Sequence, residues 1–282
     1  MDWLTAYKIP LGTWMKSLVD LLNAHAAGFF DLVSWALGSL INGFTALLVA
    51  IPPLLLVALL AGLAWLLHRS WKLAAFVAAA LLLIANLGYW QETLETLSLV
   101  VTATVLCMLL GVPLGIVAAH RPRFYTVLRP ILDLMQTIPT FVYLIPTLIL
   151  FGLGVVPGLI STVVFAIPAP IRLTYLGVSR VPQPLIEAGE AFGASRWQLL
   201  WKVELPAALP TIMAGLTQCI MLSLSMVVIA ALVGADGLGK PVVRALNTVN
   251  VARGFEAGLA IVLLAILLDR LCRRPGSAGE GA

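Results

Sequence analysis

The chain has 282 residues, of which 61% are hydrophobic and only 11% are charged. Soluble domains are about 45–50% apolar and about 25% charged, so this composition excludes an ordinary soluble protein and indicates a membrane protein. The net charge of +4 does not indicate a nucleic-acid partner, because no basic patch is interleaved with aromatic residues in a polar context. The three cysteines have no metal-ligand spacing and imply no disulfide framework, and we expect no metal site.

The first 43 residues are interpreted as an extracytoplasmic segment, 1–43, and not as a simple tail. Polar residues recur there at near-helical spacing among large apolar side chains, which predicts one or two amphipathic helices lying on the outer membrane face. These polar residues are Lys16, Asp20, Asn23, Asp31 and Ser34. A packing role and a regulatory role both stay open for this segment.

Seven stretches are long enough to cross a bilayer, which takes about 20 mainly apolar residues. They are 44–67, 73–90, 94–119, 136–153, 156–173, 207–234 and 255–270. We therefore predict an all-α membrane protein with about seven transmembrane helices. Its parts are two accessory helices in 44–90, a transmembrane domain in 91–271 and a cytoplasmic tail in 272–282.

Lys and Arg are distributed unevenly between the two sets of alternate connections, with twelve in one set and five in the other. Because cytoplasmic loops of membrane proteins carry the excess of Lys and Arg, the richer set is predicted to be cytoplasmic. The N-terminus is then outside and the C-terminus is in the cytoplasm.

None of the predicted spans holds an acidic or basic residue well inside its apolar core. Such residues mark proton relays and ion-coupling sites, so their absence argues against a proton-coupled carrier or pump. Prolines are frequent instead, and they kink membrane helices and free backbone carbonyls. Kinked, uncharged helices suit a path for a polar solute whose energy comes from elsewhere, although membrane helices also tolerate proline in general.

The stretch EAGEAFGASRWQLLWKVELP, residues 187–206, gathers charge in a chain that has little. Pro184 can open a short helix before it, and Gly193 suits the left-handed turn that ends this helix. Ser195 and Gln198 form a capping box that starts a second, apolar helix. We predict two short helices with a fixed elbow on the cytoplasmic side, which is either a knob for a partner or a loop that merely connects two spans.

The stretch GADGLGK, residues 234–240, fits the frame of a phosphate-binding loop. The next residue should be Ser or Thr to hold magnesium, but it is Pro241, and the stretch follows a long membrane helix where a buried strand is required. We expect these glycines to end a helix, and we expect the chain to bind no nucleotide or other cofactor. A short helix in 240–250 should follow.

The elbow resembles the cytoplasmic loop of ATP-binding-cassette (ABC) importer permeases, which reads E-A-A, three residues, G, nine residues, I, any residue, L-P. The matching residues here are Glu187, Ala188, Gly189, Gly193, Val203, Leu205 and Pro206. Gly189 for Ala and Val203 for Ile are the only departures. The stretches 134–152, 165–178 and 208–239 resemble bacterial importer permeases for glycine betaine, choline and proline.

This resemblance covers roughly residues 90–270 and implies the fold of type I ABC importer transmembrane domains, with a coupling loop in 175–206. It implies a homodimer in the bacterial cytoplasmic (inner) membrane, two cytoplasmic ATPase subunits that bind ATP and Mg, and an extracytoplasmic substrate-binding protein. The chain itself would not be an enzyme. The implied solute is a quaternary ammonium compound such as choline or glycine betaine.

Two other functions stay open. The alternative is a secondary carrier or channel for a small polar solute, which would need a coupling site of its own. The other is a membrane scaffold or receptor that transports nothing.

If the chain is such a permease, we expect the solute path to run along the dimer axis between 136–153 and 207–234. Hydroxyl and amide groups offer polar atoms without charge there, and methionines pack adaptably around a trimethylammonium group. The expected lining is Thr137, Thr140, Thr147, Met213, Thr217, Gln218, Met221, Ser223, Ser225 and Met226. The same hydroxyls can instead bond neighbouring helices. Lys240 and Arg244, in the outer helix, are expected to dock the binding protein.

Overall fold

The computed structural model of the chain describes residues 10–272, and these residues are almost entirely helical. Within them, five helices are long and apolar enough to cross a membrane, or six if one bent pair counts as a span. The predicted all-α membrane fold is confirmed, and the described residues contain five or six candidate spans of full length where about seven were predicted. The first nine residues of the predicted segment 1–43, and the predicted tail after Cys272, lie outside the described residues.

The predicted span 44–67 is wrong, because two separate helices share it. Helix α2 (Leu11–Ala50) takes its first part and α3 (Pro53–His68) takes the rest. The break follows from Pro52 and Pro53, since proline has no N–H to continue a helix and holds the residue before it extended. Residues 11–43 of the predicted N-terminal segment therefore belong to α2, whose backbone leaves helical geometry only at Ala26. This helix is one of the candidate membrane crossings, where helices lying on the membrane face were predicted.

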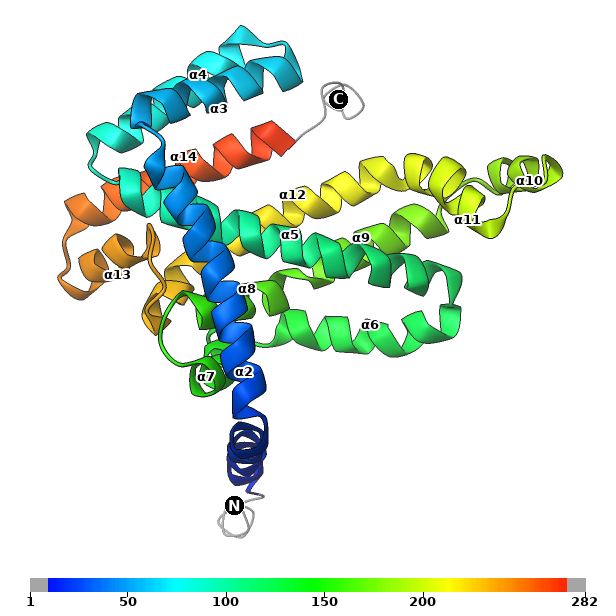
Figure 1. Cartoon of the computed structure of the whole chain (residues 1–282), viewed down its shortest axis with the longest axis horizontal. Helices are drawn as coiled ribbons and strands as arrows, with labels where there is room; N and C mark the ends of the chain where they lie inside the picture. Colours follow the sequence, from blue (N-terminus) through cyan, green and yellow to red (C-terminus); the bar gives the residue numbers. More distant parts are fainter. Residues whose placement is uncertain (1–9, 273–282) are drawn as a thin grey trace, which may run out of the picture.

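Helices α3 and α4 (Trp71–Asn86) form a hairpin at one edge of the molecule (Figure 1). Each has 16 residues, which is shorter than the ~20 that a straight crossing takes. The hairpin packs on α14 (Val251–Cys272), and the His68 ring lies 3.3 Å from the carbonyl oxygen of Leu271. The hairpin is therefore attached to the bundle mainly through α14.

Three helices pack tightly at the centre: α5 (Trp90–His120), α9 (Pro168–Ser179) and α12 (Leu205–Ala230). On the α5 side, Gly111 and Gly115 face α9. A Cβ atom on Gly115 would lie 2.6 Å from Cβ of Thr174 and 2.7 Å from the carbonyl oxygen of Ile171. Small residues four positions apart allow this close approach between membrane helices.

The other side of α9 makes the same kind of contact with α12. A Cβ atom on Gly177 would lie 3.1 Å from Cβ of Ala208, and one on Gly215 would lie 3.3 Å from Cα of Pro170. Helix α9 is thus held between α5 and α12 by glycines on both sides. We call this arrangement the glycine clasp, made of Gly111, Gly115, Gly177 and Gly215.

The predicted span 136–153 is also wrong as one helix. Its first residues belong to α6 (Pro122–Thr137), and the rest form α7 (Thr140–Phe151), which is bent from α6 by 97°. Ile138 is extended before Pro139, as expected for a residue that precedes proline. Helix α8 (Val155–Ala166) then returns and continues into α9, and this run, Val155–Ser179, is one candidate crossing.

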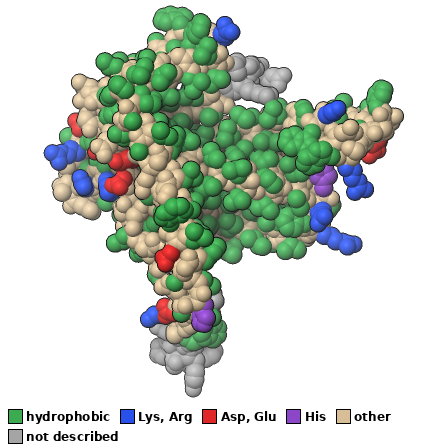
Figure 2. Space-filling view, in the orientation of Figure 1, with side chains coloured by type: hydrophobic (Ala, Val, Ile, Leu, Met, Phe, Trp, Pro, Cys, Tyr) green, Lys and Arg blue, Asp and Glu red, His purple; other side chains and the backbone are tan. Residues whose placement is uncertain are grey.

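The connections gather at two ends of the bundle (Figure 1). At one end, which we call the elbow end, lie the α5–α6 turn, α10 (Gln183–Ala191) and α11 (Arg196–Leu199). The opposite end carries the α4–α5 turn and α13 (Gly239–Asn247). On the face that Figure 2 shows, most Lys and Arg side chains lie at these two ends, others lie at the top of the view and on the lower arm, and the middle is mostly apolar.

The glycine clasp generates a prediction about stability. Gly115→Val should lower the melting temperature of the purified protein, because the new side chain overlaps the α9 backbone and overpacking costs about 1–3 kcal/mol. Gly62→Val in α3 is the matched control, since nothing lies within 4 Å of a Cβ atom there. Equal melting temperatures for the two variants would show that α5 and α9 do not need the close approach.

Candidate functional site

The predicted elbow is present, and its turn has the predicted backbone. Gly193 has a φ angle of 74°, which is the left-handed conformation that glycine reaches without strain. The Gly193 amide donates to the Glu190 carbonyl at 2.9 Å, and the Ala194 amide donates to the Gly189 carbonyl at 3.1 Å. This is the Schellman pattern, which satisfies the last carbonyls of α10.

The second helix of the elbow begins with the predicted capping box. The Ser195 hydroxyl accepts from the Gln198 amide at 3.3 Å, and the Ser195 amide donates to Oε1 of Gln198 at 2.8 Å. Both bonds satisfy donors that the start of a helix leaves free. The chain direction between the two short helices is therefore fixed on both sides of the turn.

The two elbow helices pack on each other through Gly189. A Cβ atom at this position would lie 2.5 Å from Cδ2 of Leu199 and 3.6 Å from Cγ2 of Val203. Leu199 is buried, so the space that an alanine methyl group would occupy is filled from the second helix. Packing therefore explains why this chain has glycine at position 189, where the family pattern E-A-A has alanine.

The elbow carries large apolar side chains on its surface. Phe192, next to the turn, is 93% exposed. Trp197 and Trp201 are also exposed and contact each other edge to face, with ring centroids 5.6 Å apart. Glu187, Ala188, Glu190 and Pro206 are exposed as well. A protruding surface that mixes aromatic and charged groups is typical of a protein contact.

The elbow joins α12 through a turn of π-helix, η1 (Leu200–Glu204). π-helical turns are rare in proteins, and those that occur are often at functional sites. Glu204 is only 8% exposed, and its Oε2 atom lies 2.9 Å from Nε2 of His120 at the end of α5, although the approach is not that of a hydrogen bond. The sequence analysis missed this contact, because the two residues are far apart in the chain.

The predicted path residues of α12 divide between two faces. Gln218, Met221 and Ser225 are exposed and lie on one stripe. Ser223 and Met226 are fully buried on the other side. Met213 and Thr217 are half-buried, and the Thr217 hydroxyl bonds the Met213 carbonyl. The structure therefore brings only part of the predicted set to the surface of the single chain.

The predicted threonines of the bent pair are also scattered. Thr147 is buried, and its hydroxyl lies 2.8 Å from that of Ser161 in α8, so it bonds a neighbouring helix. Thr137 is exposed and donates to the Leu134 carbonyl at 3.0 Å. Thr140, half-buried, begins α7 after the bend.

Two charged residues at the margins of the predicted spans meet between α9 and α6. Nη2 of Arg172 in α9 donates to Oδ1 of Asp133 in α6 at 2.6 Å. Helix α6 carries a polar stripe at spacings of three and four, made of Thr126, Arg129, Asp133 and Gln136, all exposed. The sequence analysis missed this stripe because it began the span at residue 136.

At the opposite end, the glycine-rich stretch is a turn, as predicted. Gly234 is left-handed and ends η2 (Ala231–Val233), and the Leu238 amide donates to the Thr96 hydroxyl of α5 at 2.8 Å. Helix α13 follows in the predicted segment 240–250. Lys240 is paired with Asp236, and Lys240 and Arg244 line a polar hollow of about 220 Å³ together with Glu92.

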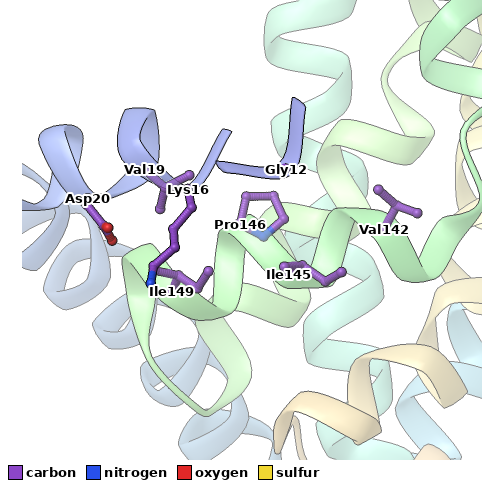
Figure 3. A pocket seen from close by; sticks show the side chains of 8 residues that line it. All are labelled: Gly12, Lys16, Val19, Asp20, Val142, Ile145, Pro146 and Ile149. Atoms are coloured by element: carbon purple, nitrogen blue, oxygen red, sulfur yellow. The ribbon is translucent and has the colours of Figure 1, made fainter. Parts of the chain in front are cut away.

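A larger and more apolar hollow lies between α7 and the part of α2 that precedes the kink at Ala26 (Figure 3). Its volume is about 620 Å³, and Lys16 of α2 reaches toward Ile149 of α7. The hollow contains none of the predicted path residues. Exposed polar residues of the predicted path occur instead on α6 and α12.

Comparison with known proteins places the chain in a family. The family described as binding-protein-dependent transport system inner membrane component matches residues 111–274. The glycine betaine transport system permease protein OpuAB of Bacillus subtilis (strain 168) is 47% identical over 264 residues, which is 94% of this chain and 93% of that protein. The glycine betaine/proline betaine permease protein ProW of Escherichia coli (strain K12) is 43% identical over 95% of this chain and 75% of its own length.

Among solved structures, a chain of the MetNI methionine ABC transporter in an inward-facing conformation has a TM-score of 0.57 and 24% identity. The match covers 64% of this chain and 94% of that chain, and it shows a likeness of fold. The expected resemblance to ABC importer permeases is confirmed by these matches. Because the family match spans more than half of its residues, the chain belongs to the binding-protein-dependent transport system inner membrane components.

Proposed function

We propose that the chain is the membrane-spanning permease subunit of an ATP-driven importer for quaternary ammonium compounds, such as choline or glycine betaine. The observation that carries this proposal is the rigid, exposed elbow at one end of a helical bundle. The names of the relatives support the solute class, since OpuAB and ProW are glycine betaine permeases. A compact trimethylammonium group is recognised by aromatic cages, and the main cage would be in the binding protein.

The elbow would transmit force from an ATPase subunit that binds ATP and Mg. Phe192, Trp197 and Trp201 offer the aromatic anchors that dominate many protein interfaces, and Glu187 lies exposed on α10 beside them. Helices α9 and α12 lead directly into the elbow from its two sides. A displacement of the elbow would therefore move the glycine clasp as a unit.

The working assembly would be a homodimer with two ATPase subunits. One chain has one elbow, while an ATP-driven pair of ATPases needs two, and twofold symmetry supplies the second with a single type of chain. The exposed stripe of Gln218, Met221 and Ser225 on α12 would then face the dimer axis and line the path.

The elbow end would be cytoplasmic. It includes the connections that are rich in Lys and Arg, as the positive-inside rule requires. The N-terminus would be outside, α14 would lead to a cytoplasmic C-terminus, and α13 would face the binding protein. The protein would lie in the bacterial inner membrane.

The function can be tested by reconstitution. Vesicles that contain the chain, its ATPase and its binding protein should accumulate labelled glycine betaine or choline only when ATP reaches the ATPase. The purified complex should contain two copies of the chain per two ATPases. ATP-independent accumulation that collapses with an ionophore would indicate a secondary carrier and contradict the proposal.

The elbow turn can be tested at Gly193. Gly193→Val should abolish uptake while the chain still accumulates in the membrane, because a left-handed backbone costs a β-branched residue roughly 1–2 kcal/mol and displaces both short helices. Gly193→Asn is the control, since asparagine tolerates this conformation. Uptake by the valine variant at the level of the asparagine variant would mean that the turn geometry does not matter.

The outer helix can be tested at Arg244. Arg244→Glu should reduce the stimulation of ATP hydrolysis by loaded binding protein several-fold, since it replaces a positive group on the proposed docking face. Lys72→Glu, in the α3–α4 hairpin, makes the same change in charge and should leave the stimulation by the binding protein intact. Normal stimulation of the Arg244 variant at every binding-protein concentration would place docking elsewhere.

A further inference from the structure

We propose that Arg172 and Asp133 form a binding point for a zwitterion on the solute path, and that they pair with each other when no solute is present. Arg172 would bind the carboxylate of the solute, and Asp133 would face its ammonium group. The inference rests on the proposed function and deepens it, because it selects zwitterions such as glycine betaine over purely cationic compounds such as choline.

The pair lies along the length of the bundle and not at one of its ends. Asp133 is eleven residues after the first residue of α6, and Arg172 is seven residues before the last residue of α9. At 1.5 Å per residue, these positions are roughly 16 Å and 10 Å from the helix ends at the elbow end. Ionisable side chains this far from the helix ends are costly wherever hydrocarbon covers them.

Both side chains are nevertheless open on the surface of the single chain. The Arg172 side chain is 34% exposed and that of Asp133 is 53% exposed. Hydrocarbon is a poor environment for such groups, because the pair would lose its hydration without gaining further donors. The exposed side of the pair is therefore expected to face water or solute, which is what a transport path provides.

Helix α6 gives independent support, because it has two exposed stripes of opposite character. The polar stripe contains Asp133 and the residues one and two turns away from it. The apolar stripe, on the other flank of the helix, is Phe124, Val127, Ile131 and Leu134, all exposed. A helix with one wet flank and one apolar flank fits the boundary between a path and the lipid.

The chemistry of the pair is complementary to a zwitterion. A guanidinium group forms a fork that matches a carboxylate, and a carboxylate attracts a quaternary ammonium group by charge. A bound zwitterion would replace both halves of the ion pair at once, so no charge would be left without a partner. A simple cation would occupy Asp133 and leave Arg172 unpaired, which is unfavourable in a site of low polarity.

The position of the pair also connects it to the elbow. Arg172 lies on α9, which is held in the glycine clasp and leads to the elbow, whereas Asp133 lies on α6, which is outside the clasp. Nearer the elbow on the same seam, Tyr125 and Tyr175 stack with ring centroids 3.5 Å apart. A movement of the elbow would shift α9 along α6 and separate both contacts.

The test measures binding of glycine betaine and of choline to the purified permease–ATPase complex in lipid nanodiscs, without the binding protein. Arg172→Gln should weaken glycine betaine binding about tenfold, the order expected for one lost charge-assisted hydrogen bond, and should leave choline binding equal or tighter. Asp133→Asn should weaken both. Arg129→Gln, on the same polar stripe, is the matched control and should change neither.

Arg172→Lys keeps the charge and the ion pair but loses the fork, so it remains informative if the glutamine variant does not assemble. It should weaken glycine betaine binding several-fold and leave choline unchanged. Wild-type complex that binds no glycine betaine, or Arg172 variants with unchanged preference between the two compounds, would overturn the proposal. Uptake by the complete wild-type system is measured in parallel, and only its absence counts against the proposed function itself.

Discussion

The glycine clasp is the contact on which the rest of the structure depends. Gly111 and Gly115 of α5, with Gly177 and Gly215 at the α9–α12 contact, leave no room for side chains between the three helices. Backbones that approach so closely gain dispersion contacts along their whole length, which is the main attraction available between helices in lipid. Helix α9 is therefore fixed to both neighbours and cannot rotate independently.

Helix α2 and the α6–α7 pair, outside the clasp, are held more loosely. Helix α2 leaves most of its surface uncovered in the single chain, and the α6–α7 pair is interrupted by a proline and bent by 97°. Helices α2, α6 and α7 thus form a loosely packed flank beside the tight centre, which carries the elbow. Relative movement between these two parts is favoured by this difference in packing.

Local signals in the sequence predicted local geometry well. Pro184, Gly193 and the pair Ser195 and Gln198 each act through their own backbone or a neighbour three residues away, so the elbow could be predicted in detail. The segment 240–250 was predicted as a helix for the same reason. The family resemblance then followed from the spacing of a few residues in the elbow.

The errors have a common cause, which is that a hydropathy window does not detect where an apolar stretch is broken. Pro52 and Pro53 divide the predicted span 44–67, and Pro139 divides α6 from α7. Contacts between distant residues could not be predicted at all. Asp133 and Arg172 are 39 positions apart, and no pattern in a single sequence indicates that they meet. The predicted path residues were chosen by side-chain chemistry alone, which does not say which face of α12 is buried.

The contact between His120 and Glu204 gives the elbow a third attachment to the bundle. Helices α9 and α12 hold the elbow through the chain itself, whereas His120, the last residue of α5, meets Glu204, the last residue of the π turn, through their side chains. A rotation of the elbow relative to the bundle would therefore have to break this contact or carry the end of α5 with it.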